Sequence, residues 1–450
     1  MNEAIHIKGV RIIDPGNGPD DGFDGVGDIV INDGVITSRG NGTPPVGARV
    51  VDGTGLVAAP GFVDLHTHLR EPGFEDKETI ATGTAAGARG GFTTLCAMPN
   101  TSPAIDSATV VNFISQQARL AGPIRVLSFG AVSRDRAGQE LTDMEELARA
   151  GVVGFTDDGS PVATGHLMQS ALLYASQLGL PIMDHCEDHS IVKGVGVNEG
   201  WVSSRLGLEG YPSAAEESII VRDIALAELT GGHFHVAHLS TAGGIEQVRL
   251  AKSRGLRVTA EVTPHHLTLT EEWVLGTHGH LHDGGVVTAV AYDTRAKVSP
   301  PLRSKADREA LLEALRDGVI DAIATDHAPH TFGDKAVTFD EATVGISVLE
   351  TAFGSLMGLV HAGSLDLPAL VQRLTAGPAS VLGKRFEEFG TLREGTAADI
   401  VLFDPEEEWV VDAQSFASRG KNTPLDGDTL KGRVKMTIAQ GEIAFDGISL

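Results

Sequence analysis

Two histidines and an arginine alternate along residues 63–73, VDLHTHLREPG. If this stretch is a strand, His66, His68 and Arg70 point to one face, because successive side chains of a strand alternate. Two imidazoles side by side at a strand end can bind a metal ion. The alternative is a strand end that is polar but binds no ligand. The residues at other strand ends are needed to distinguish a metal site from such a polar end.

Ligand-type side chains also follow other apolar runs. GFTDDG carries Asp157 and Asp158, DHCED carries His185, HVAHLST carries His238 and ATDHAPH carries Asp326. Imidazoles with carboxylates suit zinc or a similar divalent ion, and the extra carboxylates indicate two metals with one carboxylate bridging them. Each residue alone could be a hydrogen-bonded core histidine, a turn or a helix cap. Their shared position at five strand ends favours a metal site. Three more histidines lie in a glycine-rich stretch and are interpreted as exposed rather than metal-bound: His278, His280 and His282.

Eight apolar runs end in polar clusters and alternate with helix-like stretches such as DMEELARAG and HLMQSALLYASQLG. This alternation predicts a parallel sheet, and eight units over this length predict an α/β fold of the (β/α)8 TIM-barrel type. A barrel would bring the carboxyl ends of its strands to one rim, where barrel enzymes carry their active sites. An open doubly wound sheet is the rival, but no glycine-rich phosphate loop opens the first helix. The predicted strands lie within residues 61–70, 91–100, 124–133, 152–159, 181–188, 233–240, 256–266 and 321–330.

The two ends of the chain have a different character, with short strands and tight turns. DIVINDGVITSRG predicts a hairpin at residues 32–34, and VKMTIAQGEIAFDG predicts a turn at residues 440–441. Neither end has enough strands for a core of its own, so we expect one small β-sandwich domain built from both termini. The predicted domains are residues 1–58 plus 391–450 for this β domain and residues 59–390 for the barrel.

The composition of the 450-residue chain excludes several classes of protein. A formal net charge of −25 argues against a general binder of nucleic acid or of anionic membranes, whose affinity needs clustered Lys and Arg. Two cysteines allow one disulfide at most, which fits a reducing compartment. The first residues lack a signal-peptide pattern, and no apolar run reaches membrane-spanning length. We therefore expect a cytoplasmic protein.

The motifs together resemble a known family. HLREPG, GGFTTLCAMPNTSP, GFTDDG, DHCED, HVAHLST, EVTPHHL, PPLR and ATDHAPH are similar to the cyclic amidohydrolase superfamily and, within it, to bacterial dihydroorotases with an aspartate metal bridge. The likeness extends to GTLREGTAADIVLFDP and so covers nearly the whole chain. It implies a hydrolase with two Zn²⁺ per subunit that cyclises N-carbamoyl-L-aspartate reversibly to (S)-dihydroorotate plus water, in pyrimidine (UMP) biosynthesis.

The resemblance also implies roles for individual residues. His66 and His68 would hold one zinc, His185 and His238 the other, and Asp158 would bridge them. Many relatives have a carboxylated lysine as the bridge, and the fourth predicted strand here has none. Asp326 would be both a metal ligand and the catalytic acid/base. Arg70, Asn100 and His330 would grip the substrate carboxylate, and the full implied substrate-binding set is His68, Arg70, Asn100, Ser299, His330, Val344 and Gly345.

Two departures from the family pattern concern the substrate pocket. Ser299 stands where the family usually has a substrate-contacting asparagine, and Val344 precedes Gly345 where the family usually has phenylalanine. Two other functions stay open: another cyclic amidohydrolase, such as a hydantoinase or allantoinase, and a non-catalytic scaffold partner of aspartate transcarbamoylase. The resemblance further implies a homodimer, with association with aspartate transcarbamoylase as an additional expectation.

Overall fold

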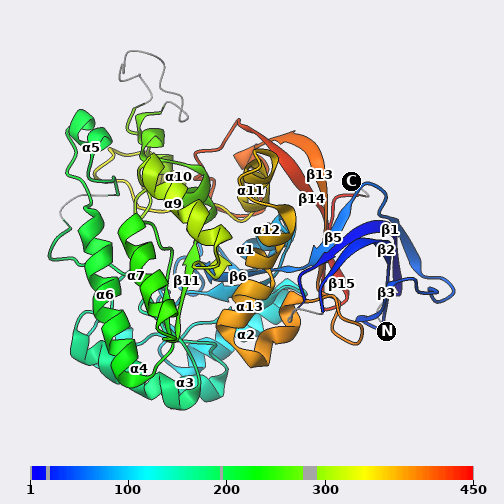
Figure 1. Cartoon of the computed structure of the whole chain (residues 1–450), viewed down its shortest axis with the longest axis horizontal. Helices are drawn as coiled ribbons and strands as arrows, with labels where there is room; N and C mark the ends of the chain where they lie inside the picture. Colours follow the sequence, from blue (N-terminus) through cyan, green and yellow to red (C-terminus); the bar gives the residue numbers. More distant parts are fainter. Residues whose placement is uncertain (1–2, 17–20, 193–195, 277–290, 449–450) are drawn as a thin grey trace.

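The computed structural model describes residues 3–16, 21–192, 196–276 and 291–448. Figure 1 shows a large body in which helices enclose strands such as β6 and β11, beside a second sheet built from strands of both ends of the chain, such as β1 and β15. The histidines at positions 278, 280 and 282 lie outside the described residues. No helix in the described ranges is long and apolar enough to cross a membrane.

The central strands close into a barrel. They form two parallel runs, β6-β7-β8 and β9-β10-β11-β12. Phe155 joins the runs on one side, because it bridges both Gly130 and Ile182, and Thr67 pairs with His327 on the other side. The predicted barrel is therefore confirmed. Its strands are β6 (Phe62–Thr67), β7 (Phe92–Ala97), β8 (Arg125–Ser128), β9 (Ile182–Asp184), β10 (Phe234–Val236), β11 (Val258–Val262) and β12 (Ala322–Ile323).

The fourth predicted strand, residues 152–159, is much shorter than expected. Only Phe155 pairs in a β-bridge, although the flanking amides of Val153 and Thr156 still donate to carbonyls of the neighbouring β8 segment. Gly154 weakens a strand, and Pro181 on the other neighbour has no N–H to donate. The segment nevertheless occupies the fourth place in the ring and delivers the aspartate pair to the rim.

Helices cover the outside of the barrel, and several begin at capping residues. Thr79, Thr164, Thr241 and Ser304 each accept a backbone hydrogen bond from the first turn of the helix that follows. The helices are α1 (Ile80–Gly90), α2 (Ala108–Ala121), α3 (Met144–Ala150), α4 (Gly165–Leu178), α5 (Trp201–Leu206), α6 (Ser213–Thr230), α7 (Ala242–Ser253), α8 (Pro264–Thr268), α9 (Lys305–Arg316), α10 (Phe332–Lys335), α11 (Ala352–His361), α12 (Leu367–Leu374) and α13 (Ala376–Leu382).

The second sheet combines strands from both ends of the chain. Its order is β15-β14-β13-β5-β1-β2-β3, with β4 paired to β1. Both predicted turns connect antiparallel neighbours, and Asp33, Gly34, Gln440 and Gly441 have the positive φ of tight hairpin turns. The strands are β1 (Ile5–Asp14), β2 (Phe23–Asn32), β3 (Val35–Gly40), β4 (Arg49–Asp52), β5 (Val57–Pro60), β13 (Ile400–Val410), β14 (Thr429–Ala439) and β15 (Glu442–Asp446).

Apolar side chains of these strands form a core of their own, separate from the core of the barrel. The core of the second sheet includes Ile7, Ile31, Ile400 and Ile438. Strand β5 leads directly into β6, so the second sheet and the first barrel strand are joined through Gly61. The boundaries 1–58 plus 391–450 and 59–390 remain our proposal for the division into domains.

Candidate active site

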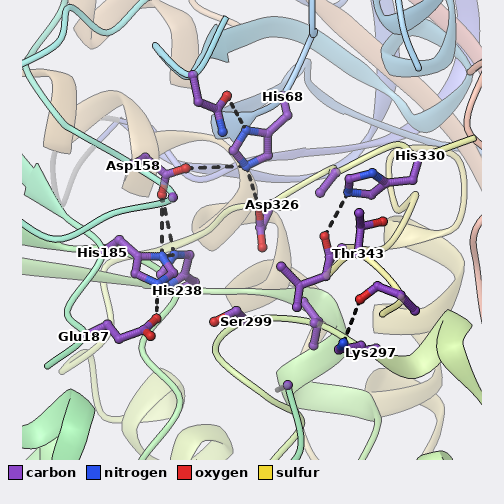
Figure 2. A pocket seen from close by; sticks show the side chains of 18 of the residues that line it. His68, Asp158, His185, Glu187, His238, Lys297, Ser299, Asp326, His330 and Thr343 are labelled. Atoms are coloured by element: carbon purple, nitrogen blue, oxygen red, sulfur yellow. Dashed lines mark hydrogen bonds and ion pairs between the residues drawn. The ribbon is translucent and has the colours of Figure 1, made fainter. Parts of the chain in front are cut away.

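The predicted metal ligands meet at the carboxyl end of the barrel (Figure 2). His66 lies in β6 and His68 just beyond it. The other predicted ligands lie within three residues after Phe155, β9, β10 and β12, respectively: Asp158, His185, His238 and Asp326. All six side chains are buried. His238 and Asp326 have positive φ values of 32° and 47°, a conformation that non-glycine residues adopt rarely and that recurs at functional sites.

Two overlapping groups could each hold a cation. One consists of His66, His68 and Asp326, and the other of His66, Asp158 and His238. Asp326 Oδ1 lies 3.0 Å from His68 Nε2 and 3.7 Å from His66 Nε2. His185 belongs to the same centre, because its Nδ1 lies 2.8 Å from His238 Nε2.

Asp158 lies between the histidine pairs. Its Oδ1 is 3.2 Å from His66 Nε2, 3.6 Å from His238 Nε2 and 3.8 Å from His185 Nδ1. Its Oδ2 is 3.5 Å from His68 Nε2. The carboxylate of Asp158 is therefore within 4 Å of both histidine pairs.

The outer nitrogen of three of these imidazoles is hydrogen-bonded to an acceptor. His66 Nδ1 donates to Glu261 Oε1 at 2.8 Å, and His68 Nδ1 donates to Asn100 Oδ1 at 2.9 Å. His185 Nε2 donates to Glu187 Oε2 at 2.9 Å. Each of these bonds leaves a lone pair on the inner nitrogen, the arrangement that metal-ligating histidines have.

In the candidate metal centre, nitrogen and oxygen atoms that carry lone pairs point toward one another. His66 Nε2 and Asp158 Oδ1 are buried, and within the described ranges neither makes a hydrogen bond. Buried polar atoms without partners are rare, and a cation between them would satisfy both. The residues present therefore fit a bound divalent metal.

The electrostatics agree with this assignment. Burial alone lowers the pKa of His66, but Asp158, Glu261 and Asp326 together outweigh burial and raise the pKa well above its usual value. Burial alone raises the pKa of Asp326, but the hydrogen bond to His68 and the nearby His66 outweigh it and lower the pKa. The centre therefore attracts positive charge and keeps its carboxylates ionised.

The metal centre opens into a pocket of about 540 Å³. All seven residues of the implied substrate-binding set line it: His68, Arg70, Asn100, Ser299, His330, Val344 and Gly345. His66 lies beneath the lining, fully buried, and the other implied ligands are part of it. Asp157 is not: it is buried away from the pocket, where its carboxylate accepts from the amide of Ser133 at 3.0 Å.

Arg70 and His330 form one wall of the pocket. Burial lowers the pKa of Arg70 to about 10, so its guanidinium remains charged at neutral pH. Arg70 Nη2 lies 3.3 Å from His330 Nε2, which donates to the carbonyl of Val344 at 2.8 Å. Burial and the Arg70 charge lower the pKa of His330 to about 2, which keeps its imidazole neutral. This wall offers one fixed cation for an anionic group.

Two buried lysines hold the loop that carries Val344 and Gly345. Lys297 Nζ donates to the carbonyls of Phe339, Asp340 and Ala342, at 2.6, 3.2 and 2.6 Å. Lys335 Nζ donates to the carbonyls of Thr294, Lys297 and Thr343, at 3.0, 3.1 and 2.7 Å. The backbone of this loop is therefore fixed against the segment that precedes Ser299.

The sequence interpretation missed several supporting residues. Glu261 accepts from His66 and also from His235 Nε2, at 3.2 Å, and these bonds outweigh burial and lower its pKa to about 2. A glutamate inside the apolar run VTAEV was the available signal, since a buried charge needs a partner. Lys297 and Asn422 had no comparable signal, because their partners are distant in the sequence. Glu187 lies two residues from its partner His185, and Lys335 binds carbonyls that only the fold brings to it, at Thr294 and Lys297.

Comparison with known proteins supports the same assignment. A family model described as "Dihydro-orotase-like" matches residues 55–243, and one described as "Amidohydrolase family" matches residues 199–445. A dihydroorotase of Anaeromyxobacter dehalogenans strain 2CP-1 is 48% identical over 99% of this chain and 99% of its own. A dihydroorotase of Caldanaerobacter subterraneus is 46% identical over 94% of this chain and 95% of its own.

Solved structures show a similar fold. An L-hydantoinase (dihydropyrimidinase) from Arthrobacter aurescens superposes with a TM-score of 0.84 at 24% identity, covering 99% of this chain and 97% of its own. A D-hydantoinase superposes with a TM-score of 0.81 at 26% identity, covering 99% of this chain and 95% of its own. The hydantoinases share the architecture at about half the identity of the dihydroorotases. By its full-length similarity to the latter, the chain belongs to the dihydroorotase family of the amidohydrolase superfamily.

Proposed function

We propose that the protein is a dihydroorotase, which converts N-carbamoyl-L-aspartate reversibly to (S)-dihydroorotate and water in pyrimidine biosynthesis. The observation that carries this proposal is the pocket itself, in which groups of His and Asp that could hold a metal share the lining with a buried arginine. A cyclic amide with a carboxylate substituent fits both halves of such a pocket. Full-length relatives named dihydroorotase support the same substrate.

The metal centre would hold two Zn²⁺ ions. His66 and His68 would bind the first, His185 and His238 the second, with Asp158 shared between them and Asp326 as a further ligand of the first. Imidazole and carboxylate donors suit zinc, although the same donors also accept other divalent ions. Bound zinc would polarise the reacting carbonyl and lower the pKa of a coordinated water.

Asp326 would move the proton. Its carboxylate faces the pocket and is kept ionised by its histidine neighbours, so it can act as a base at neutral pH. In ring opening, Asp326 takes a proton from the attacking water and passes it to the departing ring nitrogen. In ring closure, the carbamoyl nitrogen attacks the side-chain carboxyl carbon, and Asp326 transfers the proton from that nitrogen to the leaving oxygen. That oxygen takes a second proton from solution and leaves as water, because the carboxylate enters the reaction ionised.

Arg70, Asn100 and His330 would orient the substrate. The Arg70 guanidinium can bind the remaining carboxylate in a bidentate manner, which fixes both position and rotation. The neutral His330 imidazole and the loop at Val344 and Gly345 support the same end of the substrate. Orientation of this kind places the ring carbonyl at the metal centre.

The test is the rate of carbamoyl aspartate cyclisation, measured before chelation, after chelation and after zinc is added back. We expect chelation to abolish the activity and zinc to restore it, with two zinc ions per chain by elemental analysis. Dihydroorotate, hydantoin and allantoin should be assayed in parallel. Faster turnover of hydantoin or allantoin would identify a different cyclic amidohydrolase, and a metal-free, inactive protein would identify a scaffold.

The assembly and the compartment also belong to this proposal. We expect a homodimer, association with aspartate transcarbamoylase, and a cytoplasmic location. The buried free thiols of Cys96 and Cys186 support a reducing compartment. Light scattering of the isolated protein, and then of its mixture with aspartate transcarbamoylase, would measure both associations.

A further inference from the structure

Tyr211 is held through its backbone and its ring, but its hydroxyl makes no hydrogen bond within the described ranges. The residue is 2% exposed and lies between α5 and α6, where its amide donates to the Val197 carbonyl at 2.7 Å. Its own carbonyl accepts from Glu199 N at 3.0 Å and from Arg303 Nη1 at 3.1 Å. The Arg303 guanidinium also lies over the ring, 4.9 Å from its centroid.

The Tyr211 hydroxyl is buried, and it has no hydrogen-bond partner in the part of the chain that the structure describes. The tyrosine lines the same pocket as Arg70 and Ser299. An unpaired buried hydroxyl is destabilising, so its persistence in a rigid setting points to a partner that arrives with the ligand. Burial and the charge of Glu187 raise the pKa of the phenol, which keeps it a hydrogen-bond donor at all working pH values.

The position of Tyr211 indicates which substrate atom it meets. In the proposed function the substrate carboxylate binds at the Arg70 guanidinium. The largest charge acting on Tyr211 is instead that of Glu187, which is hydrogen-bonded to His185 on the metal-ligand side. In Figure 2, Glu187 and Ser299 lie on the opposite side of the pocket from His330. A neutral donor on that side suits an uncharged carbonyl oxygen rather than the carboxylate.

We propose that Tyr211 is a substrate-binding residue whose hydroxyl donates a hydrogen bond to the carbamoyl oxygen of the substrate. The inference rests on the proposed dihydroorotase function and deepens it. It also accounts for Ser299, whose short side chain reaches less far into the pocket than the asparagine usual in the family. Tyr211 would supply a polar contact in place of the one that an asparagine at position 299 would make.

Tyr211→Phe tests this inference, with Tyr292→Phe as the matched control. The hydroxyl of Tyr292 donates to the Leu206 carbonyl at 2.8 Å, and Tyr292 is not part of the pocket lining. Tyr211→Phe removes no hydrogen bond from the free protein, so its Tm should stay the same or rise, while KM for carbamoyl aspartate increases about five- to tenfold. Tyr292→Phe should show the reverse, with a lower Tm and an unchanged KM.

Two further measurements keep the test independent of turnover and of folding. The rise in Tm caused by saturating carbamoyl aspartate should be smaller in Tyr211→Phe than in the wild type, each against its own baseline. Ser299→Asn should recover part of the lost affinity in the Tyr211→Phe background and change the wild type less. Wild-type KM and a wild-type ligand shift in Tyr211→Phe would overturn the inference. A wild-type protein without cyclisation activity or ligand shift would instead overturn the proposed function.

Discussion

Asp326 combines two demands in one carboxylate. It must remain ionised near the imidazoles, and it must face the substrate to move a proton. Asp326→Asn keeps an oxygen that can ligate a metal but removes the base. We expect kcat to fall about 10²- to 10⁴-fold while most of the zinc remains bound. Full activity at saturating zinc would contradict the acid/base role.

The control for this substitution is Asp340→Asn. Asp340 lines the same pocket, but it is exposed and its backbone carbonyl, rather than its carboxylate, is held by Lys297. Loss of its charge should change kcat less than about twofold, within the range of ordinary surface effects. A comparable loss of activity in both variants would indicate a general effect of pocket charge instead of proton transfer.

Arg70 is the buried cation of the substrate wall. Its guanidinium is held by the Pro329 carbonyl, to which Nε donates at 3.3 Å, and no carboxylate pairs with it among the described residues. We expect Arg70→Ala to raise KM for carbamoyl aspartate at least tenfold, because a charge-assisted hydrogen bond is lost. Metal content should not change. Arg119→Ala, on the exposed face of α2, should leave KM unaltered; equal KM values in all three proteins would remove Arg70 from the binding site.

At the scale of elements, two loops of the site depend on a residue far along the chain. Asn422 Oδ1 accepts from the amide of His330 at 2.9 Å, and its Nδ2 donates to the carbonyls of Ala328 and Gly345, both at 3.0 Å. Asn422 is 5% exposed, so these groups have no access to solvent. One side chain therefore sets the spacing between the two loops that line the substrate wall.

Asn422→Ala should leave three buried backbone groups without partners. We expect a loss of about 1–3 kcal/mol in the free energy of unfolding, and a severalfold rise in KM as His330 and Gly345 shift apart. Urea unfolding and steady-state kinetics measure the two effects, and zinc content should be unchanged. Asn112→Ala, at an exposed position of α2, should alter neither quantity. A fall in stability with a wild-type KM would show that the loops keep their spacing without Asn422.

Site residues could be predicted from the sequence where the signal lies close by in the chain, and could not where it depends on residues that only the fold brings together. His66, His185 and Asp326 were found because a strand end can be located from its own apolar run, and a barrel brings all such ends together. Asn422 and Lys335 were missed because their partners are fixed only by the tertiary fold. The one-residue fourth strand was overestimated because Pro181, which removes a donor, belongs to its neighbour.

At the scale of the whole molecule, the barrel and the second sheet are tied by polar contacts as well as by packing. Asp399, next to β13, pairs with Arg125 of β8 and accepts from the amide of Gln440. Thr437 in β14 donates to the Ala88 carbonyl of α1 at 2.7 Å. The carboxy-terminal strands thus reinforce the outside of the barrel although they contribute no residue to the candidate metal centre.

Glu78 makes a further connection of this kind, between the loop before α1, the eighth barrel segment and the carboxy-terminal part of the chain. It is fully buried, accepts from Ser418 Oγ and, at 3.1 Å, from Arg419 N, and lies 3.3 Å from His327 Nε2. Burial alone raises its pKa, but the contacts with His327, Ser418 and Thr82 outweigh burial and lower the pKa below 4.5.

The sign of the resulting pH dependence follows from this shift. Because the folded pKa lies below the unfolded value of 4.5, the ionised Glu78 stabilises the fold above pH 4.5, and this contribution is lost as the pH falls through the folded pKa. Glu78→Gln should be less stable than the wild type at pH 7.5, by about 1–3 kcal/mol, and the difference should narrow below pH 4.5. Urea unfolding of both proteins, at pH 7.5 and at a pH below 4.5, measures this difference in the free energy of unfolding.

The comparison isolates Glu78 because acid-induced loss of metal affects both proteins alike, so that it cancels in the difference between them. Glu75→Gln, three residues earlier and exposed, should follow the wild type at both pH values. A gap between Glu78→Gln and the wild type that stays constant down to pH 3 would mean that shape, and not charge, holds the three segments together. A gap that closes would mean that acid weakens the junction of the barrel with the carboxy-terminal segment by protonating this buried carboxylate.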